Sequence, residues 1–280
     1  MSALVGLGCA AAAGLVGWFT PVVVRRLPEP DPEPEPEPEP EPTGESDGDA
    51  EPSPEKGEHD TAPRRQRKPI PDFSLWGMHA VEREKELYRD LADVRGLALF
   101  CALASALVAG LLGLKFGWYP VLAVVIPPVP VLVAIAVLDW RTRYIPNRLV
   151  LPATAYVVLA GVVLWLVVDA QTELIRGLLG LVAVRTFFWV LWFIRAAGMG
   201  FGDVRLSALL SFVLAYLGPA ELVLGIWLGF ILFGVPGLLI SAIKRDYRLM
   251  RVPFPFGPFM VLGALLGIFL GQPVTDLLYG

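Results

Sequence analysis

The chain has 280 residues, of which 55% are hydrophobic, and its mean hydropathy is +0.60. This composition excludes an ordinary soluble domain and predicts a membrane protein. The formal net charge of −4 says little about partners, because the acidic residues cluster between Glu29 and Asp60 and most basic residues lie elsewhere. The two cysteines, Cys9 and Cys101, form no CxxC pair and are too few for a four-thiolate zinc site. We expect no metal, no cofactor and no nucleic-acid partner.

Eight apolar segments are candidates for membrane-spanning helices, each of which needs about 20 mostly apolar residues. They are expected at 3–24, 97–114, 119–138, 149–168, 174–194, 206–218, 221–243 and 256–272, and the sixth is short. Basic residues follow the first segment rather than precede it, which favours an uncleaved span over a signal peptide. The predicted fold is all-α, a polytopic bundle of about eight transmembrane helices. The expected division is a first transmembrane helix at 1–24, a cytoplasmic loop at 25–96 and a transmembrane core at 97–280.

The loop at 25–96 is the longest polar segment of the chain. Its part 28–60 begins with alternating proline and glutamate, which favours extended, self-repelling polyproline II, so we expect disorder there. A basic patch at 64–68 is suited to anionic lipid headgroups, and the usual excess of basic residues in cytoplasmic loops explains it equally well. Interleaved charges predict a helix at 80–96 that leads into the second span.

The basic residues of the short loops predict the orientation of the bundle, since cytoplasmic loops are enriched in Lys and Arg. With eight spans, four basic groups fall on one side: Arg25 and Arg26; Arg141, Arg143 and Arg148; Arg195 and Arg205; and Lys244, Arg245, Arg248 and Arg251. That side is expected to be cytoplasmic, which puts both termini outside. Arg185, deep in the fifth span, has no predicted role.

Acidic residues at membrane depth are candidates for function, because an ionised carboxylate in lipid is costly. Four acids are expected to be solvated at the outer ends of spans: Asp169, Glu173, Glu221 and Asp276. Asp246 lies among basic residues and is expected to be a loop counter-ion. The remaining two are Asp139, at the end of the third span, and Asp203, at the start of the sixth. The topology puts both at the cytoplasmic mouth of the bundle.

Two carboxylates that share a site hold one proton between them, and such a pair suits general acid–base hydrolysis of a peptide bond by water. Gly200 and Gly202 allow an irregular backbone that presents Asp203 into a cavity. Pro146 and Asn147 after Asp139 predict a rigid turn and the start of the fourth span. Arg205 is expected either to pair with Asp203 or to bind a lipid phosphate.

The motifs "DWRTRYIPN" at 139–147 and "GMGFGDVRLSALL" at 198–210 resemble those of the type IV prepilin peptidase family, bacterial members of the GxGD membrane aspartyl proteases. The stretch "FPFGPFMVLGA" at 254–264, with Pro255 and Gly257, is similar to that family's entry to its last span. The resemblance implies that Asp139 and Asp203 are the catalytic pair of an aspartic endopeptidase in the bacterial plasma membrane. Its substrates would be prepilin or pseudopilin precursors of type IV pili and protein secretion, cut after a glycine on the cytoplasmic side. Membrane lipid would surround the protein.

One departure concerns methylation. Many members of that family carry two CxxC pairs in the first cytoplasmic loop, with a zinc site linked to N-methylation of the new terminus, and no cysteine occurs in that loop here. We therefore expect a peptidase without methyltransferase activity. The alternatives are an ion- or proton-coupled transporter that uses the two aspartates, and a non-catalytic scaffold for pilus or secretion assembly. A metal pair bridged by the aspartates is a minor alternative.

Overall fold

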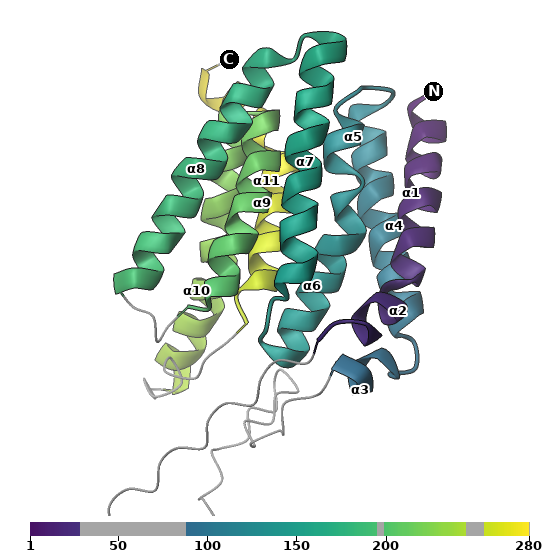
Figure 1. Ribbon diagram of the computed structural model, residues 1–280. Helices are drawn as coiled ribbons and strands as arrows, with labels where there is room; N and C mark the ends of the chain where they lie inside the picture. The colour runs from purple at the N-terminus through teal and green to yellow at the C-terminus, as the bar shows by residue number, and fades with distance from the viewer. Residues whose placement is uncertain (29–87, 195–198, 245–254, 280) are drawn as a thin grey trace, which may run out of the picture. The chain divides into compact units, whose positions relative to one another are not determined.

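A computed structural model describes residues 1–28, 88–194, 199–244 and 255–279. Within these ranges the regular elements are all helices, which run side by side as a bundle (Figure 1). Their bounds are α1 Ser2–Trp18, α2 Thr20–Arg25, α3 Tyr88–Ala92, α4 Leu97–Phe116, α5 Leu122–Val125, α6 Pro128–Thr142, α7 Asn147–Val168, α8 Gln171–Ile194, α9 Phe201–Leu217, α10 Pro219–Lys244 and α11 Gly257–Tyr279.

Six helical segments of the described chain are long and apolar enough to cross a membrane: Ser2–Arg25, Leu97–Phe116, Leu122–Thr142, Asn147–Val168, Gln171–Ile194 and Gly257–Leu277. The other two expected spans correspond to α9, with 17 residues, and α10, whose part Pro219–Val235 is apolar but shorter than the rest. The predicted all-α polytopic fold is confirmed.

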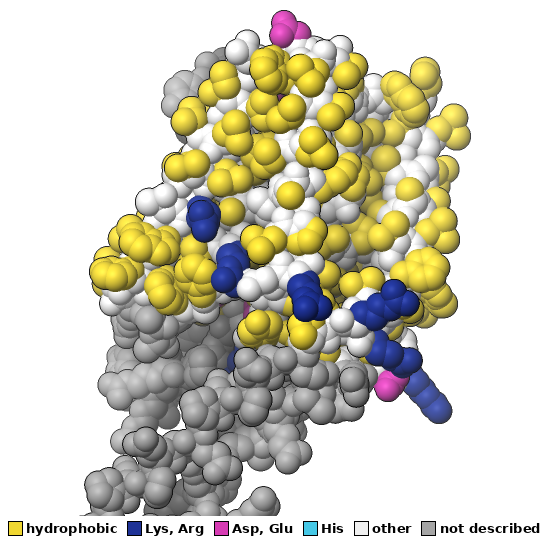
Figure 2. Space-filling view, viewed as in Figure 1, with side chains coloured by type: hydrophobic (Ala, Val, Ile, Leu, Met, Phe, Trp, Pro, Cys, Tyr) yellow, Lys and Arg dark blue, Asp and Glu magenta, His cyan; other side chains and the backbone are white. Residues whose placement is uncertain are grey.

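The surface of the bundle is apolar, as lipid contact requires. Leu103 is 61% exposed, Leu166 71% and Phe193 71%. Figure 2 shows hydrophobic side chains over most of the helical surface, while Lys and Arg gather toward its lower part. The chain is therefore a multi-pass membrane protein.

Several helix boundaries differ from those expected. The first span is interrupted at Phe19, and the third by the prolines at 127 and 128, which separate α5 from α6. The end of the predicted helix at 80–96 is also broken: α3 ends at Ala92, and a turn leads to Gly96, whose φ of 89° suits glycine. The expected disordered tract, the basic patch and the first residues of that helix lie outside the described ranges.

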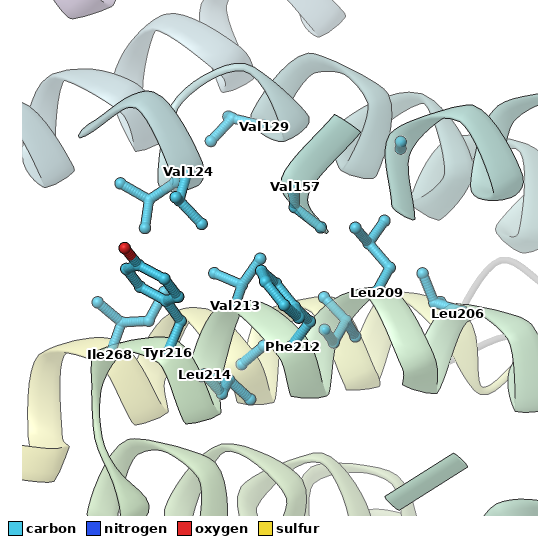
Figure 3. Packing of buried hydrophobic residues seen from close by; sticks show 14 of the residues in the cluster. Val124, Val129, Val157, Leu206, Leu209, Phe212, Val213, Leu214, Tyr216 and Ile268 are labelled. Carbon is cyan, nitrogen blue, oxygen red and sulfur yellow. The ribbon is translucent and has the colours of Figure 1, made fainter. Parts of the chain in front are cut away.

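Helix α9 lies at the centre of the bundle, where it contacts α7, α8, α10 and α11. All its residues from Asp203 to Tyr216 are buried except Arg205. Figure 3 shows how Leu209, Phe212 and Val213 of α9 point toward Val124 and Val157 from the neighbouring helices. An apolar helix that is buried on all sides needs no amphipathic stripe, which explains the nearly uniform hydrophobicity of this segment.

Helices α10 and α11 approach each other through glycines. A Cβ on Gly267 of α11 would overlap the backbone of Gly225 of α10 and lie 2.8 Å from the carbonyl oxygen of Glu221. Close contacts of this kind between small residues drive association of helices in lipid. They hold α11, and with it Gly257 at its start, in a fixed position.

The beginning of the described chain forms a smaller hydrophobic core with α3. Val24, Leu91 and Leu138 are buried together in it, and Arg25 of α2 forms an ion pair with Asp93 just after α3. Both termini lie at one end of the bundle (Figure 1). The end of α6 and the starts of α9 and α11 lie at the opposite end.

Candidate active site

Asp139 lies in the last turn of α6, three residues before the helix ends at Thr142. Its side chain is 4% exposed, and its Oδ2 accepts a 2.8 Å hydrogen bond from the backbone N–H of Gly257, the first residue of α11. A Cβ on Gly257 would lie 2.7 Å from the same oxygen, so a side chain there would force the carboxylate or the start of α11 to shift. The last turn of one helix and the first residue of another thus fix this carboxylate.

Asp203 is the third residue of α9 and is 7% exposed. Its Oδ2 accepts a 3.2 Å hydrogen bond from the backbone N–H of Gly200, the N-cap residue of the helix. Gly200 has extended backbone, with φ −71° and ψ 145°, so the chain reaches α9 through an irregular segment, as the glycines predict. Asp203 therefore caps its own helix, and its carboxylate is kept near the helix start, where an anion is favoured.

Asp139 and Asp203 are 64 positions apart in the sequence, but the end of α6 and the start of α9, which carry them, lie at the same end of the bundle (Figure 1). The two carboxylates are close enough to interact electrostatically. Ile145 lies between the glycines at the starts of α9 and α11: it is 5% exposed and packs against Gly202 of α9 and Gly257 of α11. Sequence reasoning placed both acids at the same membrane depth but did not single out Ile145.

The turn after Asp139 is fixed by the residues expected to support it. Pro146 immediately precedes α7, which begins at Asn147. The side-chain oxygen of Asn147 accepts a hydrogen bond from Nη1 of Arg205 on α9. The guanidinium of Arg205 also lies 4.6 Å from the centre of the Phe201 ring. Arg205 therefore joins the turn to α9, and its pairing with Asp203 or with a lipid phosphate stays a prediction.

Pro255 and Phe256, before the start of α11, are buried. The Phe256 ring lies 5.3 Å from that of Phe230 and 5.0 Å from that of Phe233, both on α10. These contacts hold the entry to α11, and hence the Gly257 N–H, against the neighbouring helix.

Glu221 was expected to be a solvated acid, and this prediction is wrong. Its side chain is 6% exposed, because the first turn of α10 packs against Gly271 of α11. Lys115 of α4 interacts electrostatically with it, and the Lys115 Nζ donates a 2.5 Å hydrogen bond to the carbonyl oxygen of Ile268. These charges lie at the end of the bundle away from Asp139 and Asp203.

Two arginines of α8 have different environments. Arg176 donates hydrogen bonds to the carbonyl oxygens of Ala215, Tyr216 and Leu217, the last three residues of α9. It also borders a groove of about 480 Å³ between α8, the end of α9 and the start of α10, far from the two aspartates. Arg185 is exposed on the surface of α8, and the described residues give it no hydrogen bond or ion pair.

Within the described ranges, no three His, Cys, Asp or Glu side chains are grouped as metal ligands. The fold and the site together define a multi-pass helical membrane protein with a pair of buried, interacting aspartates at one end of its bundle.

Comparison with known proteins assigns the family. Residues 128–238, which include both aspartates, match the model of the type IV leader peptidase family. A "Prepilin leader peptidase/N-methyltransferase" of Xanthomonas campestris pv. campestris is 30% identical over 282 residues, or 97% of this chain and 94% of that protein. The chain therefore belongs to the type IV leader peptidase family, which confirms the predicted family.

Other relatives match over shorter stretches. Proteins with the same name are 30% identical in Burkholderia pseudomallei (strain 1026b), over 53% of this chain, and 27% identical in Bacillus subtilis (strain 168), over 62%. The chain spans about half the length of the Burkholderia relative, 47%, and 66% of the Bacillus one. No solved structure matches the chain.

Proposed function

We propose that the protein is an aspartic endopeptidase that removes the basic leader from prepilin-like or pseudopilin precursors. The observation that carries the proposal is a pair of buried, electrostatically interacting carboxylates from separate helices, Asp139 of α6 and Asp203 of α9, each held by the N–H of a glycine. Support comes from the family, whose model covers both residues, and from relatives named as prepilin leader peptidases.

The reaction needs one proton on the pair, a state that two neighbouring carboxylates favour because both cannot ionise cheaply. The ionised carboxylate takes a proton from water while the water oxygen attacks the peptide carbonyl carbon. The protonated carboxylate gives its proton to the carbonyl oxygen. The tetrahedral intermediate then collapses: one hydroxyl returns its proton to the pair, the C–N bond breaks, and the leaving nitrogen takes the other proton. The pair again holds one proton, and no covalent intermediate forms.

The aspartate pair is assigned to the cytoplasmic face of the inner membrane, with both termini outside. The basic residues Arg141, Arg143 and Arg148 are exposed beside the pair, as expected for a cytoplasmic end. A leader that stays in the cytoplasm would then reach the site while the apolar helix after it lies in the bilayer.

We also propose that this chain does not methylate the new terminus, because Cys9 and Cys101 are its only cysteines and the first long loop has none. Because relatives are named as N-methyltransferases, a methylation assay tests this part of the proposal directly. Incubation with the processed precursor and a labelled methyl donor should leave the new amino group unlabelled, and labelling would reject this part of the proposal.

Substitution of each aspartate tests the peptidase. Asp139→Asn and Asp203→Asn should each reduce leader cleavage at least about 10²-fold, because each removes a group that must hold or accept the proton. Asp169→Asn is the matched control, since Asp169 is exposed at the other end of the bundle. Full cleavage by both active-site variants would rule out the enzyme. Loss of activity in a chelator would instead favour a metal bridged by the pair.

A further inference from the structure

Ile145 touches glycines at the starts of two helices of the site, Gly202 of α9 and Gly257 of α11. A Cβ on Gly202 would lie 2.8 Å from the Ile145 Cβ and 3.4 Å from its Cγ1. A Cβ on Gly257 would lie 3.3 Å from the Ile145 Cδ1. Ile145 is 5% exposed and therefore fills the space between these two backbones.

The start of each of these two helices provides a backbone N–H that binds one of the aspartates. The N–H of Gly257 donates to Asp139, and Gly202 lies in the segment between Gly200, whose N–H donates to Asp203, and Asp203 itself. The distance between the starts of α9 and α11 therefore influences the distance between the two carboxylates. An isoleucine side chain is stiff about its first torsion, so it suits the role of a spacer.

The turn that carries Ile145 is itself fixed on both sides. Before it, the hydroxyl of Thr142 donates a 2.9 Å hydrogen bond to the carbonyl oxygen of Leu138, and Arg143 takes the left-handed conformation with φ 55°. After it, Asn147 is hydrogen-bonded to Arg205 of α9. A spacer on a fixed turn can set a position, whereas a spacer on a free loop would move with its neighbours.

We propose that Ile145 is a positioning residue that sets the approach of the Asp139 and Asp203 carboxylates, an inference that rests on the proposed peptidase function. The apolar side chain of Ile145 has no group that can hold or transfer a proton. Ile145 acts through the starts of α9 and α11. Without its side chain these helix starts can move, and the two carboxylates leave the spacing at which they share one proton. A displacement of about 1 Å in a catalytic group can reduce the rate about 10²-fold.

Two substitutions that shorten the Ile145 side chain to different extents test its role as a spacer. Ile145→Ala removes every side-chain atom beyond Cβ and should reduce kcat at least about 10-fold while KM changes less than about twofold, because the pair and not the substrate contact is altered. Ile145→Val removes Cδ1, which would lie 3.3 Å from a Cβ on Gly257 and 3.5 Å from one on Gly202, but it keeps the closer contacts of Cβ and Cγ1 with Gly202 and should give a smaller loss. In Ile145→Ala the acidic and basic limbs of the pH–rate profile should move toward each other, since carboxylates that lie further apart interact less.

The matched control is Ile268→Ala. Ile268 is 6% exposed, about as buried as Ile145, but it lies eleven residues beyond Gly257 along α11. The Ile268→Ala protein should lose a similar side-chain volume from its core and keep the kcat and the pH–rate profile of the unaltered protein. All variants are made in the full chain, purified in detergent and assayed on a precursor with a basic leader and an apolar helix, with thermal unfolding measured alongside.

The outcomes separate this inference from the proposed function. If Asp139→Asn and Asp203→Asn are inactive but Ile145→Ala and Ile145→Val keep the kcat and pH–rate profile of the unaltered protein, the spacer role is overturned and the peptidase stands. If Ile268→Ala loses as much kcat as Ile145→Ala, with the same profile, general packing explains the effect and the inference is also overturned. If both aspartate variants retain cleavage, the proposed function itself fails. Should Ile145→Ala not fold, the Ile145→Val profile decides.

Discussion

The backbone N–H of Gly257 donates a 2.8 Å hydrogen bond to the carboxylate of Asp139, which lies 118 positions earlier in the chain. This contact links the start of the last helix to the end of α6. It also explains why a glycine stands there, since a Cβ on Gly257 would come within 2.7 Å of the same carboxylate oxygen. The motif around Gly257 is therefore part of the site, although the chain between the two residues forms most of the bundle.

Gly257→Ala should abolish most of the cleavage activity. The new methyl group would have to displace the Asp139 carboxylate or the start of α11, and either movement separates the pair; we expect at least about a 10²-fold loss of kcat. The measurement is the rate of leader removal by purified protein. Gly234→Ala is the control, because nothing lies within 4 Å of a Cβ at that helical position. Equal activity of the two variants would contradict the role given to Gly257.

The hydrogen bond between Arg205 and Asn147 should stabilise the fold as well as the site. Because its donor is charged and partly buried, its coupling energy is expected to be about 1–2 kcal/mol. A double-mutant cycle with Arg205→Met and Asn147→Ala, followed by unfolding in detergent, separates this contact from the packing of Arg205 on Phe201. Independent effects of the two substitutions would show that the contact adds nothing.

The sequence was sufficient to predict the family, the helical fold and the position of the two aspartates at the same end of the bundle. Those inferences depend on local properties: apolar length gives the spans, and an even number of passes between Asp139 and Asp203 puts them at the same end. The short sixth span proved to be α9, which begins earlier than expected because Asp203 caps it. Its burial on all sides removes the need for a span as long as those that face lipid.

Contacts between distant segments could not be predicted in this way. The motif after Asp139 predicts a turn that includes Ile145, but the contact of Ile145 with two glycines depends on how three helices pack. Glu221 was predicted to be solvated because it stands near a helix end, whereas the close approach of α10 and α11 covers it. A single sequence gives the position of an acid along its helix, but which neighbour covers it depends on tertiary packing.

The buried charges at the other end should contribute to stability and not to chemistry. Glu221→Gln leaves Lys115 without its anionic neighbour, and Lys115→Met leaves the Glu221 carboxylate buried beside apolar groups. Each should lower the free energy of unfolding by about 1–3 kcal/mol, and the double substitution by less than the sum of the two. Catalysis per folded molecule should be unchanged. Asp276→Asn is the control, since Asp276 is exposed on α11. A selective loss of kcat in Glu221→Gln would indicate that this end takes part in the reaction.

Close packing of α10 on α11 should tolerate no added carbon. Gly267→Ala would push a methyl group into the backbone of Gly225. Because this backbone cannot move aside as a side chain can, α10 and α11 must move apart. We expect a loss of about 1–3 kcal/mol in the free energy of unfolding, as for other overpacked sites, and a lower yield of folded protein. Activity should fall with it, because α11 also carries Gly257. Gly8→Ala on α1, where a Cβ meets nothing within 4 Å, should leave the unfolding temperature unchanged. If Gly267→Ala unfolds at the same temperature as Gly8→Ala, the two helices do not pack as closely as this contact requires.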